Sequence, residues 1–264
     1  MNCRPAAEQA AEACLRTAFR GLYPEGALHG AFRWNGDDAR GELAANHALV
    51  SAAALGFSPA VLAERLAEAA ELPPLFSAVT AAGGFLNFRL SPAWYASALE
   101  TLCAATDGAV PDFSPARFPG LDPRIAPRQD AASPLYRLRW AYERSRALLE
   151  TEAPAPEVGE ALWSETEKAL LLRLTATEDT RSLFAMGDAF GRFYASCPIR
   201  CTEGAARNRR LRLLTAFCRV VEKATDCRTG VSRRESVFYR EKTFSIFFKN
   251  PIDKSEKCVI VLIA

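Results

Sequence analysis

The sequence has few of the side chains that enzymes commonly use at their active sites. It contains only two histidines, His29 and His47, and no lysine before Lys168. No Gly-x-x-x-x-Gly-Lys or Gly-x-Gly-x-x-Gly loop is present, which excludes two common phosphate-binding loops. No Ser-His-Asp set can be assembled convincingly, because no motif surrounds a nucleophile. The composition therefore disfavours an enzyme that works on its own.

Metal-binding and membrane signals are also lacking. The chain has 8 cysteines, but no Cys-x-x-Cys pair exists, so zinc spacing is absent. Free thiols in a reducing compartment fit this pattern better than disulfides. No apolar run approaches the roughly 20 residues of a membrane span, and the start has no signal-peptide core. We expect a cytoplasmic protein with no metal, no cofactor and no membrane contact.

Charge is unevenly distributed along the chain. Residues 1–110 hold 7 basic and 11 acidic residues, whereas the stretch from Arg192 to Arg234 holds 11 basic and 3 acidic. A concentrated basic stretch is the electrostatic footprint of a face that contacts nucleic-acid phosphates. A solvated helical surface has the same composition, so charge alone leaves both interpretations open.

The first hundred residues predict a small α+β domain. The apolar periodicity and turn residues predict helices at 6–22, 41–55, 59–72 and 92–105, and strands at 27–34, 76–81 and 85–90. Ser58-Pro59 and Ser91-Pro92 supply an N-cap and a first-turn proline for two of the helices. An Asn35-Gly36 turn closes the first strand.

The rest of the chain predicts an all-α antiparallel bundle after a linker. Residues 107–132 are rich in proline and show no apolar period, which is typical of a loosely packed linker. Helices are expected at 133–150, 157–177, 180–196 and 205–227, and short joins make neighbours antiparallel. The predicted domains are 1–106 (α+β), 107–132 (linker), 133–237 (helical bundle) and 238–264 (an atypical tail).

Three motifs in the first domain resemble one family. Gly41–Leu49 is similar to Gly-Asp-Tyr-Ala-Thr-Asn-x-Ala-Leu, Ser58–Leu66 to Asn-Pro-Arg-x-Ile-Ala-x-x-Leu, and Gly84–Phe88 to Gly-Phe-Ile-Asn-Phe. These are motifs of the N-terminal domain of arginyl-tRNA synthetases. The resemblance implies a domain that rests on the elbow of tRNA. We place Asn87 on the strand face opposite Phe85 and Phe88, so we expect it to form a nucleotide hydrogen bond, whereas at least one of Phe85 and Phe88 should be buried.

The second half resembles the DALR anticodon-binding domain of the same family. Tyr136–Arg144 is similar to Tyr-x-x-Gln-Tyr-Ala-His-Ala-Arg, with Arg139 in place of Gln and Tyr142 in place of His. Glu167–Leu174 resembles Glu-Lys-x-Leu-Leu-x-x-Leu. The most specific match is Ala189–Ile199, which resembles Ala-Phe-Asn-x-Phe-Tyr-x-x-Cys-Pro-Val. Only Ser91–Leu135 separates the two halves, where the family carries its catalytic domain.

The resemblance implies recognition of tRNA, most simply tRNA-Arg, without catalysis. The family's His-x-Gly-His loop and catalytic-lysine loop are both missing. Unpaired anticodon bases are read by stacking and by hydrogen bonds to base edges. Trp140, Tyr142 and Tyr194 can stack, although Trp140 and Tyr194 are equally suited to a core. The expected contact residues of the second half are Arg137, Arg139, Tyr142, Arg144, Arg192, Arg200, Arg207, Arg209 and Arg210.

Alternatives stay open on the sequence alone. The chain can instead be one part of a split arginyl-tRNA synthetase that works with a separate catalytic chain. It can also present tRNA to a tRNA-modifying enzyme, act as an interaction scaffold, or come from a decaying gene copy. The tail 238–264 has one Arg and four Lys, against 26 Arg and two Lys before it. A domain of unlike origin or a disrupted reading frame explains this change; we favour the latter, because Val237 aligns with the usual end of the family's chain.

Overall fold

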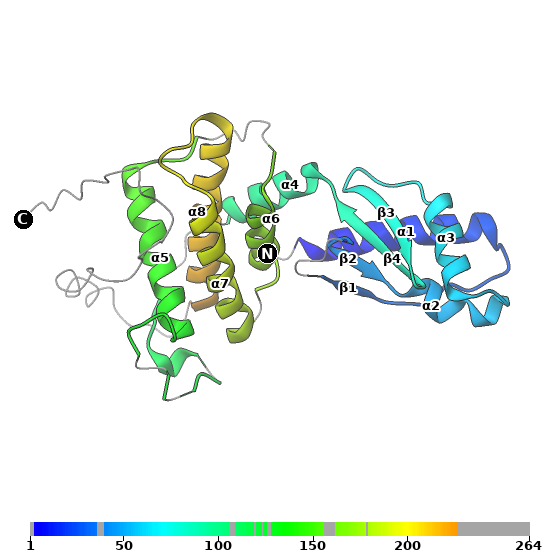
Figure 1. Cartoon of the computed structure of the whole chain (residues 1–264), viewed down its shortest axis with the longest axis horizontal. Helices are drawn as coiled ribbons and strands as arrows, with labels where there is room; N and C mark the ends of the chain where they lie inside the picture. Colours follow the sequence, from blue (N-terminus) through cyan, green and yellow to red (C-terminus); the bar gives the residue numbers. More distant parts are fainter. Residues whose placement is uncertain are drawn as a thin grey trace, which may run out of the picture. The chain divides into compact units, whose positions relative to one another are not determined.

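The computed structural model describes residues 3–35, 40–105, 109–118, 120–122, 124–125, 128–155, 162–177 and 179–225. The first part is built on an antiparallel sheet with the strand order β1-β2-β4-β3. Its strands are β1 (Phe32–Trp34), β2 (Leu43–Ala45), β3 (Phe76–Ala82) and β4 (Phe85–Leu90). The accompanying helices are α1 (Arg4–Leu22), α2 (His47–Ser51), the 3-10 turn η1 (Ala53–Leu55) and α3 (Pro59–Ala69); Figure 1 shows α1 running alongside the strands.

The strands predicted at 76–81 and 85–90 are confirmed, and they form the centre of the first part. Phe88 and Leu86 of β4 are fully buried, and Phe76 of β3 packs against Phe88 with ring centroids 5.0 Å apart. Gly83 and Gly84 turn the chain between the two strands with φ of 56° and 87°. These left-handed conformations favour glycine, because it has no Cβ.

The helix expected over residues 41–55 is wrong at its start. Residues Leu43–Ala45 form β2, which pairs with both β1 and β4, and the helix α2 begins only at His47. Gly41 has φ of 146°, and a Cβ at this position would lie 2.7 Å from the carbonyl oxygen of Phe88. The alanine-rich sequence favours a helix locally, but pairing with distant β4 decides the outcome.

Helix starts marked by Ser-Pro are confirmed. The hydroxyls of Ser58, Ser91 and Ser133 each accept a hydrogen bond at 3.3 Å from the backbone N–H three residues later. They cap α3, α4 (Pro92–Cys103) and α5 (Pro134–Thr151), respectively. Each cap satisfies a backbone donor that the first helical turn leaves without a partner.

Four helices follow in the second part: α5, α6 (Glu165–Leu174), α7 (Thr180–Ser196) and α8 (Gly204–Thr225). Contacts between Arg137 and Asp188 and between Arg144 and Tyr194 show that α5 and α7 run in the same direction. Tyr142 of α5 contacts Glu222 near the end of α8, whereas Arg207 near the start of α8 contacts Glu152 just after the end of α5. The two helices are therefore antiparallel. The directions alternate along the chain as the sequence predicted. The core between these helices includes Phe190 and Phe217, whose ring centroids lie 4.7 Å apart.

Helix α4 packs against both parts of the chain. Its Tyr95 hydroxyl donates to Glu42 Oε1 at 2.9 Å, and the same carboxylate accepts the N–H of Leu90 at 2.8 Å. On the other side, α4 contacts α6 and α8, and Glu100 forms an ion pair with Arg212 of α8. The Tyr95 ring also lies 5.5 Å from that of Trp163, just before α6.

The proline-rich segment is anchored by two phenylalanines, although we expected loose packing. Phe118 follows the 3-10 turn η2 (Pro115–Arg117) and is 3% exposed. Its ring stacks near Phe184 at 5.7 Å, and Phe113 contacts Tyr142 at 5.7 Å. Two aromatic anchors need no periodic pattern, which explains why no apolar period marked them.

Several predicted features lie outside the described residues. They are Gly36 of the first turn, residues 157–161 of the helix expected at 157–177, and everything from residue 226 to 264. The last range includes Val237 and the atypical tail.

Candidate nucleic-acid interface

The α5–α7 face combines aromatic rings with arginine. Tyr194 of α7 lies edge-on to Trp140 of α5, with ring centroids 5.6 Å apart. Arg144 Nε donates to the Tyr194 hydroxyl at 2.6 Å, and its guanidinium carbon lies 5.6 Å from the same ring centroid. All three side chains are half-buried. The Tyr194 ring also stacks on buried Phe190, with ring centroids 5.8 Å apart, so a base can stack only on the parts of the two rings that remain exposed, with a fixed cation beside them.

Two exposed arginines lie near the end of α7. Arg192 is on the last turns of the helix, and Arg200 is in the turn that follows it. Within the described ranges, neither forms an ion pair with a carboxylate. A phosphate can therefore contact either of them without displacing a described carboxylate.

The other two predicted arginines of α5 are engaged in exposed ion pairs. Arg137 Nε donates to Asp188 Oδ1 at 2.7 Å, and Arg139 Nε donates to Glu143 Oε1 at 2.7 Å. Their side chains keep 35% and 38% of their surface in solvent. Exposed pairs of this kind are weak, so an approaching phosphate can compete with the carboxylate.

Tyr142 does not lie on the surface where base stacking requires it. Its side chain is buried, and its hydroxyl donates to Glu222 Oε1 at 2.8 Å. Burial, followed by the hydrogen bond to Glu222 and the charge of that carboxylate, raises the pKa of Tyr142 above its usual range. The expectation that Tyr142 stacks on an anticodon base does not fit this position, because the residue is only 9% exposed and its ring packs near Phe113.

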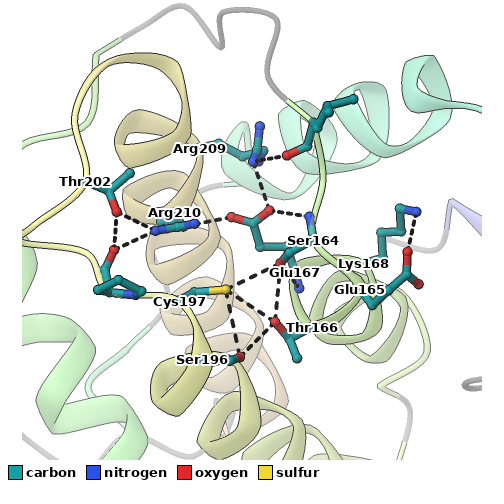
Figure 2. Close-up of polar contacts among 12 residues, drawn as sticks. Ser164, Glu165, Thr166, Glu167, Lys168, Ser196, Cys197, Thr202, Arg209 and Arg210 are labelled. Atoms are coloured by element: carbon teal, nitrogen blue, oxygen red, sulfur yellow. Dashed lines mark hydrogen bonds and ion pairs between the residues drawn. The ribbon is translucent and has the colours of Figure 1, made fainter. Parts of the chain in front are cut away.

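The arginines at the start of α8 pair with carboxylates. Arg207 donates to Glu152 Oε2 through Nη2 at 2.6 Å and Nε at 3.2 Å. Arg209 and Arg210 both pair with Glu167 of α6, at 2.9 Å each (Figure 2). Arg209 is 1% exposed, so it cannot reach a phosphate on the surface. We expected these three arginines to contact phosphate, and the burial of Arg209 and the three acceptors of Arg210 argue against it for those two. Arg207 keeps 39% of its side chain in solvent, much as Arg137 and Arg139 do, so its predicted contact stays open.

Glu167 is the residue that sequence reasoning missed. It is fully buried, and its Oε2 also accepts the backbone N–H of Ser164 at 2.8 Å, which completes a capping box at the start of α6. Arg209 further donates to the carbonyl oxygen of Leu162 at 2.7 Å and lies 4.9 Å above the Trp163 ring. The Glu-Lys motif and the arginine run were both visible in the sequence. Their pairing across 42 residues was not.

Asn87 lies in the middle of the sheet. It faces away from buried Phe88, and its neighbours across the strands are Ala44 and Thr80. By the same alternation it shares its face with Phe85, which is 41% exposed, so the expected separation of Asn87 from Phe85 is wrong. Asn87 itself is only 5% exposed, so a nucleotide can reach no more than the edge of its amide.

The described ranges contain no cluster of three metal-ligating side chains. In the same ranges, no helix is long and apolar enough to cross a membrane. The cysteines described are all free, and burial is the main cause that raises the pKa of the Cys218 thiol to about 12. This thiol is therefore protonated at neutral pH and is unreactive as a metal ligand.

A family model matches part of this chain, and a solved structure aligns with it at low identity. Residues 31–90 match the family model for the arginyl tRNA synthetase N terminal domain. No curated protein matches the chain. Among solved structures, arginyl-tRNA synthetase from Thermus thermophilus aligns with a TM-score of 0.32 and 16% identity. The alignment covers 80% of this chain and 38% of that one, so the chain spans well under half the length of the solved relative.

Proposed function

We propose that this chain, whose residues 31–90 are related to the N-terminal domain of arginyl-tRNA synthetases, is a non-catalytic tRNA-binding protein. Its first part contacts the elbow of tRNA, and its α5–α8 bundle is a DALR-type domain that contacts the anticodon arm. The tRNA of choice is tRNA-Arg. The protein acts alone in binding and supplies no active site for aminoacylation.

The observation that carries the proposal is the α5–α7 face. Trp140 and Tyr194 present half-buried rings, and Arg144 is fixed beside them. Arg192, on another side of α7 from Tyr194, and Arg200, in the turn after α7, add exposed charge that no described carboxylate neutralises. Rings read unpaired bases, whereas cations contact the backbone irrespective of sequence. This division is what an anticodon loop requires. The contacts proposed for this face are those of Arg137, Arg139, Arg144, Arg192 and Arg200, with Asn87 on the first part.

The ion pairs within the bundle predict a modest electrostatic contribution to tRNA binding. Much of the basic stretch in α8 is neutralised internally, because Arg207, Arg209 and Arg210 have carboxylate partners. The number of phosphates contacted by the bundle is therefore set mainly by α5 and α7, because Arg209 and Arg210 of α8 are withdrawn from solvent. We expect a smaller salt dependence than the raw count of arginines suggests.

The test is binding of the purified chain to total tRNA at several salt concentrations, with sequencing of the retained RNA. Enrichment of tRNA-Arg is the expected result. Replacing Arg192 and Arg200 together by alanine should lower the salt slope by about 0.7 to 0.9 for each phosphate that the variant no longer neutralises. Arg181→Ala is the matched control, because Arg181 is exposed at the opposite end of α7. Equal binding and equal salt slopes for all three proteins would contradict the proposal.

A second candidate is a trans-acting part of a split arginyl-tRNA synthetase. It is favoured by the family match, which is confined to the N-terminal domain of a synthetase. Co-purification of the chain with a separately encoded catalytic chain, and arginine-tRNA ligation by the pair, would identify this function. Presentation of bound tRNA to a modifying enzyme would instead yield a partner with no synthetase activity.

A further inference from the structure

The turn between α7 and α8 is held by one arginine of α8. Arg210 Nη1 donates to the carbonyl oxygen of Pro198 and to Thr202 Oγ1, at 2.6 Å each. The Thr202 hydroxyl itself donates to the Pro198 carbonyl at 2.6 Å. Figure 2 shows these contacts meeting at the guanidinium. Both ends of the turn are thereby joined to a single side chain.

The same guanidinium is fixed from the opposite side. Arg210 Nε donates to Glu167 Oε1 at 2.9 Å, and Glu167 is fully buried. The planar fork of arginine can satisfy a carboxylate and a carbonyl group at once, which the single ammonium of lysine cannot do in the same geometry. The buried carboxylate therefore holds Arg210 in place, and Arg210 holds the turn.

The start of the turn is anchored independently. Cys197 is buried, and its sulfur lies 3.4 Å from Ser164 Oγ and 3.3 Å from Thr166 Oγ1. Ile199 is also buried, at 5% exposure, whereas Arg200 between these anchors and Thr202 is exposed. The chain thus presents Arg200 to solvent from a backbone that is tied on both sides.

We propose that Arg210 is a positioning residue, which does not contact RNA but clamps the Cys197–Thr202 turn so that Arg200 meets a backbone phosphate. This inference rests on the proposed function for its ligand, an RNA phosphate. The sequence predicted that Arg210 contacts RNA itself, but its guanidinium already binds Glu167, Pro198 and Thr202, so we give it a positioning role instead. A side chain held in its bound arrangement loses less conformational entropy on binding, so the clamp strengthens the Arg200 contact.

Two variants test the clamp without removing charge. Thr202→Val deletes the hydroxyl that ties the end of the turn to Arg210 and to the Pro198 carbonyl, whereas the direct Arg210–Pro198 bond and every ion pair stay intact. Arg210→Lys keeps the positive charge but loses the fork, and Arg209 still neutralises Glu167. Hydrogen exchange of the peptide over residues 197–203 and tryptic cleavage after Arg200 report the order of the turn without any RNA. Both should increase in each variant.

RNA binding then separates positioning from direct contact. Each variant should bind tRNA about 2- to 10-fold more weakly, and the double variant should be no weaker than either single one. Arg200→Ala in a Thr202→Val background should add little, because the clamp acts through Arg200. Arg207→Lys is the matched control, because Arg207 is on the same helix and pairs with Glu152 outside the turn.

The outcomes are distinct. Unchanged exchange and unchanged tRNA affinity in both Thr202→Val and Arg210→Lys would overturn the clamp. Faster exchange with normal affinity would show that the turn is held but that Arg200 meets no phosphate. If the parent binds no RNA, the proposed function fails and the presentation of Arg200 fails with it, whereas the exchange rates still decide whether Arg210 holds the turn.

Discussion

Glu167 and Arg209 form an ion pair at 2.9 Å in which the two side chains are 0% and 1% exposed. Transferring both charges from water carries a large desolvation cost, which the pair offsets only because its hydrogen bonds are nearly complete. Ser164 N–H and Arg210 supply the further donors to Glu167. The pair therefore joins α6 to α8 in a way that tolerates little change.

Removal of Arg209 should destabilise the fold strongly. In Arg209→Met the buried Glu167 carboxylate loses its fully buried partner, and we expect a loss of about 3 kcal/mol or more in the free energy of unfolding. Urea unfolding followed by circular dichroism measures it. Arg192→Met is the control, because Arg192 is exposed and should change stability by less than about 0.5 kcal/mol. Equal stabilities of the two variants would contradict the role given to this pair.

His47 should make stability fall in mild acid. Burial lowers the pKa of His47, and this effect exceeds the opposing one of Glu12, whose Oε2 lies 2.8 Å from Nε2. The unfolded chain, with a histidine pKa of about 6.5, then binds a proton more readily than the folded chain. Stability is fully present above that value and is lost as pH falls below it toward the lowered folded-state pKa.

The measurement is the melting temperature between pH 8 and pH 5, compared with a His47→Gln variant. The parent should lose stability through this window, and the variant should lose less of it. His29→Gln serves as the control, because His29 is exposed. A pH dependence that is the same in all three proteins would assign the effect to other groups.

Phe118 should be required for the stability of the helical part. Phe118→Ala removes a ring that is 3% exposed and packs near Phe184, and we expect a cost of about 3 kcal/mol. Phe85→Ala, at a position 41% exposed, should cost much less. Phe118→Ala should also make residues 109–118 more sensitive to protease. If trypsin and chymotrypsin already cut this segment first in the parent, the packing is too weak to matter.

The isolated chain should not activate arginine. It has no lysine before Lys168 and no His-x-Gly-His loop, so it lacks the charged groups that would stabilise the transferring phosphates. We expect no arginine-dependent ATP–pyrophosphate exchange and no charging of tRNA-Arg. Exchange above background that persists through rigorous purification would refute this expectation.

Local signals in the sequence predicted the fold better than they predicted the interface. The Ser-Pro caps of α3, α4 and α5 depend on residues three positions apart, so they can be read directly. The strand β2 depends on pairing with β4, more than 40 residues away, and was mistaken for a helix. Phe118 depends on a partner in α7 and gave no periodic signal.

The same distinction applies to the predicted contact residues. Arg192 and Arg200 are exposed, and neither forms an ion pair with a carboxylate among the described residues. Arg209 looked identical to them in the sequence, yet it is buried against a carboxylate 42 positions earlier. Charge counts cannot separate a cation that awaits a ligand from one that already has a partner in the fold.

The contacts of α4 affect where this chain can be divided for experiment. A fragment that starts after residue 106 would remove the helix that supplies Glu100 to Arg212 and the Tyr95 ring to Trp163. It would also leave the α8 surface covered by α4 open to water. A bundle fragment that keeps its native packing should therefore begin at Ser91, so that the cap of α4 is retained. The corresponding first-half fragment would then lose Tyr95 as the donor to Glu42, and each half would need a designed replacement at its new surface.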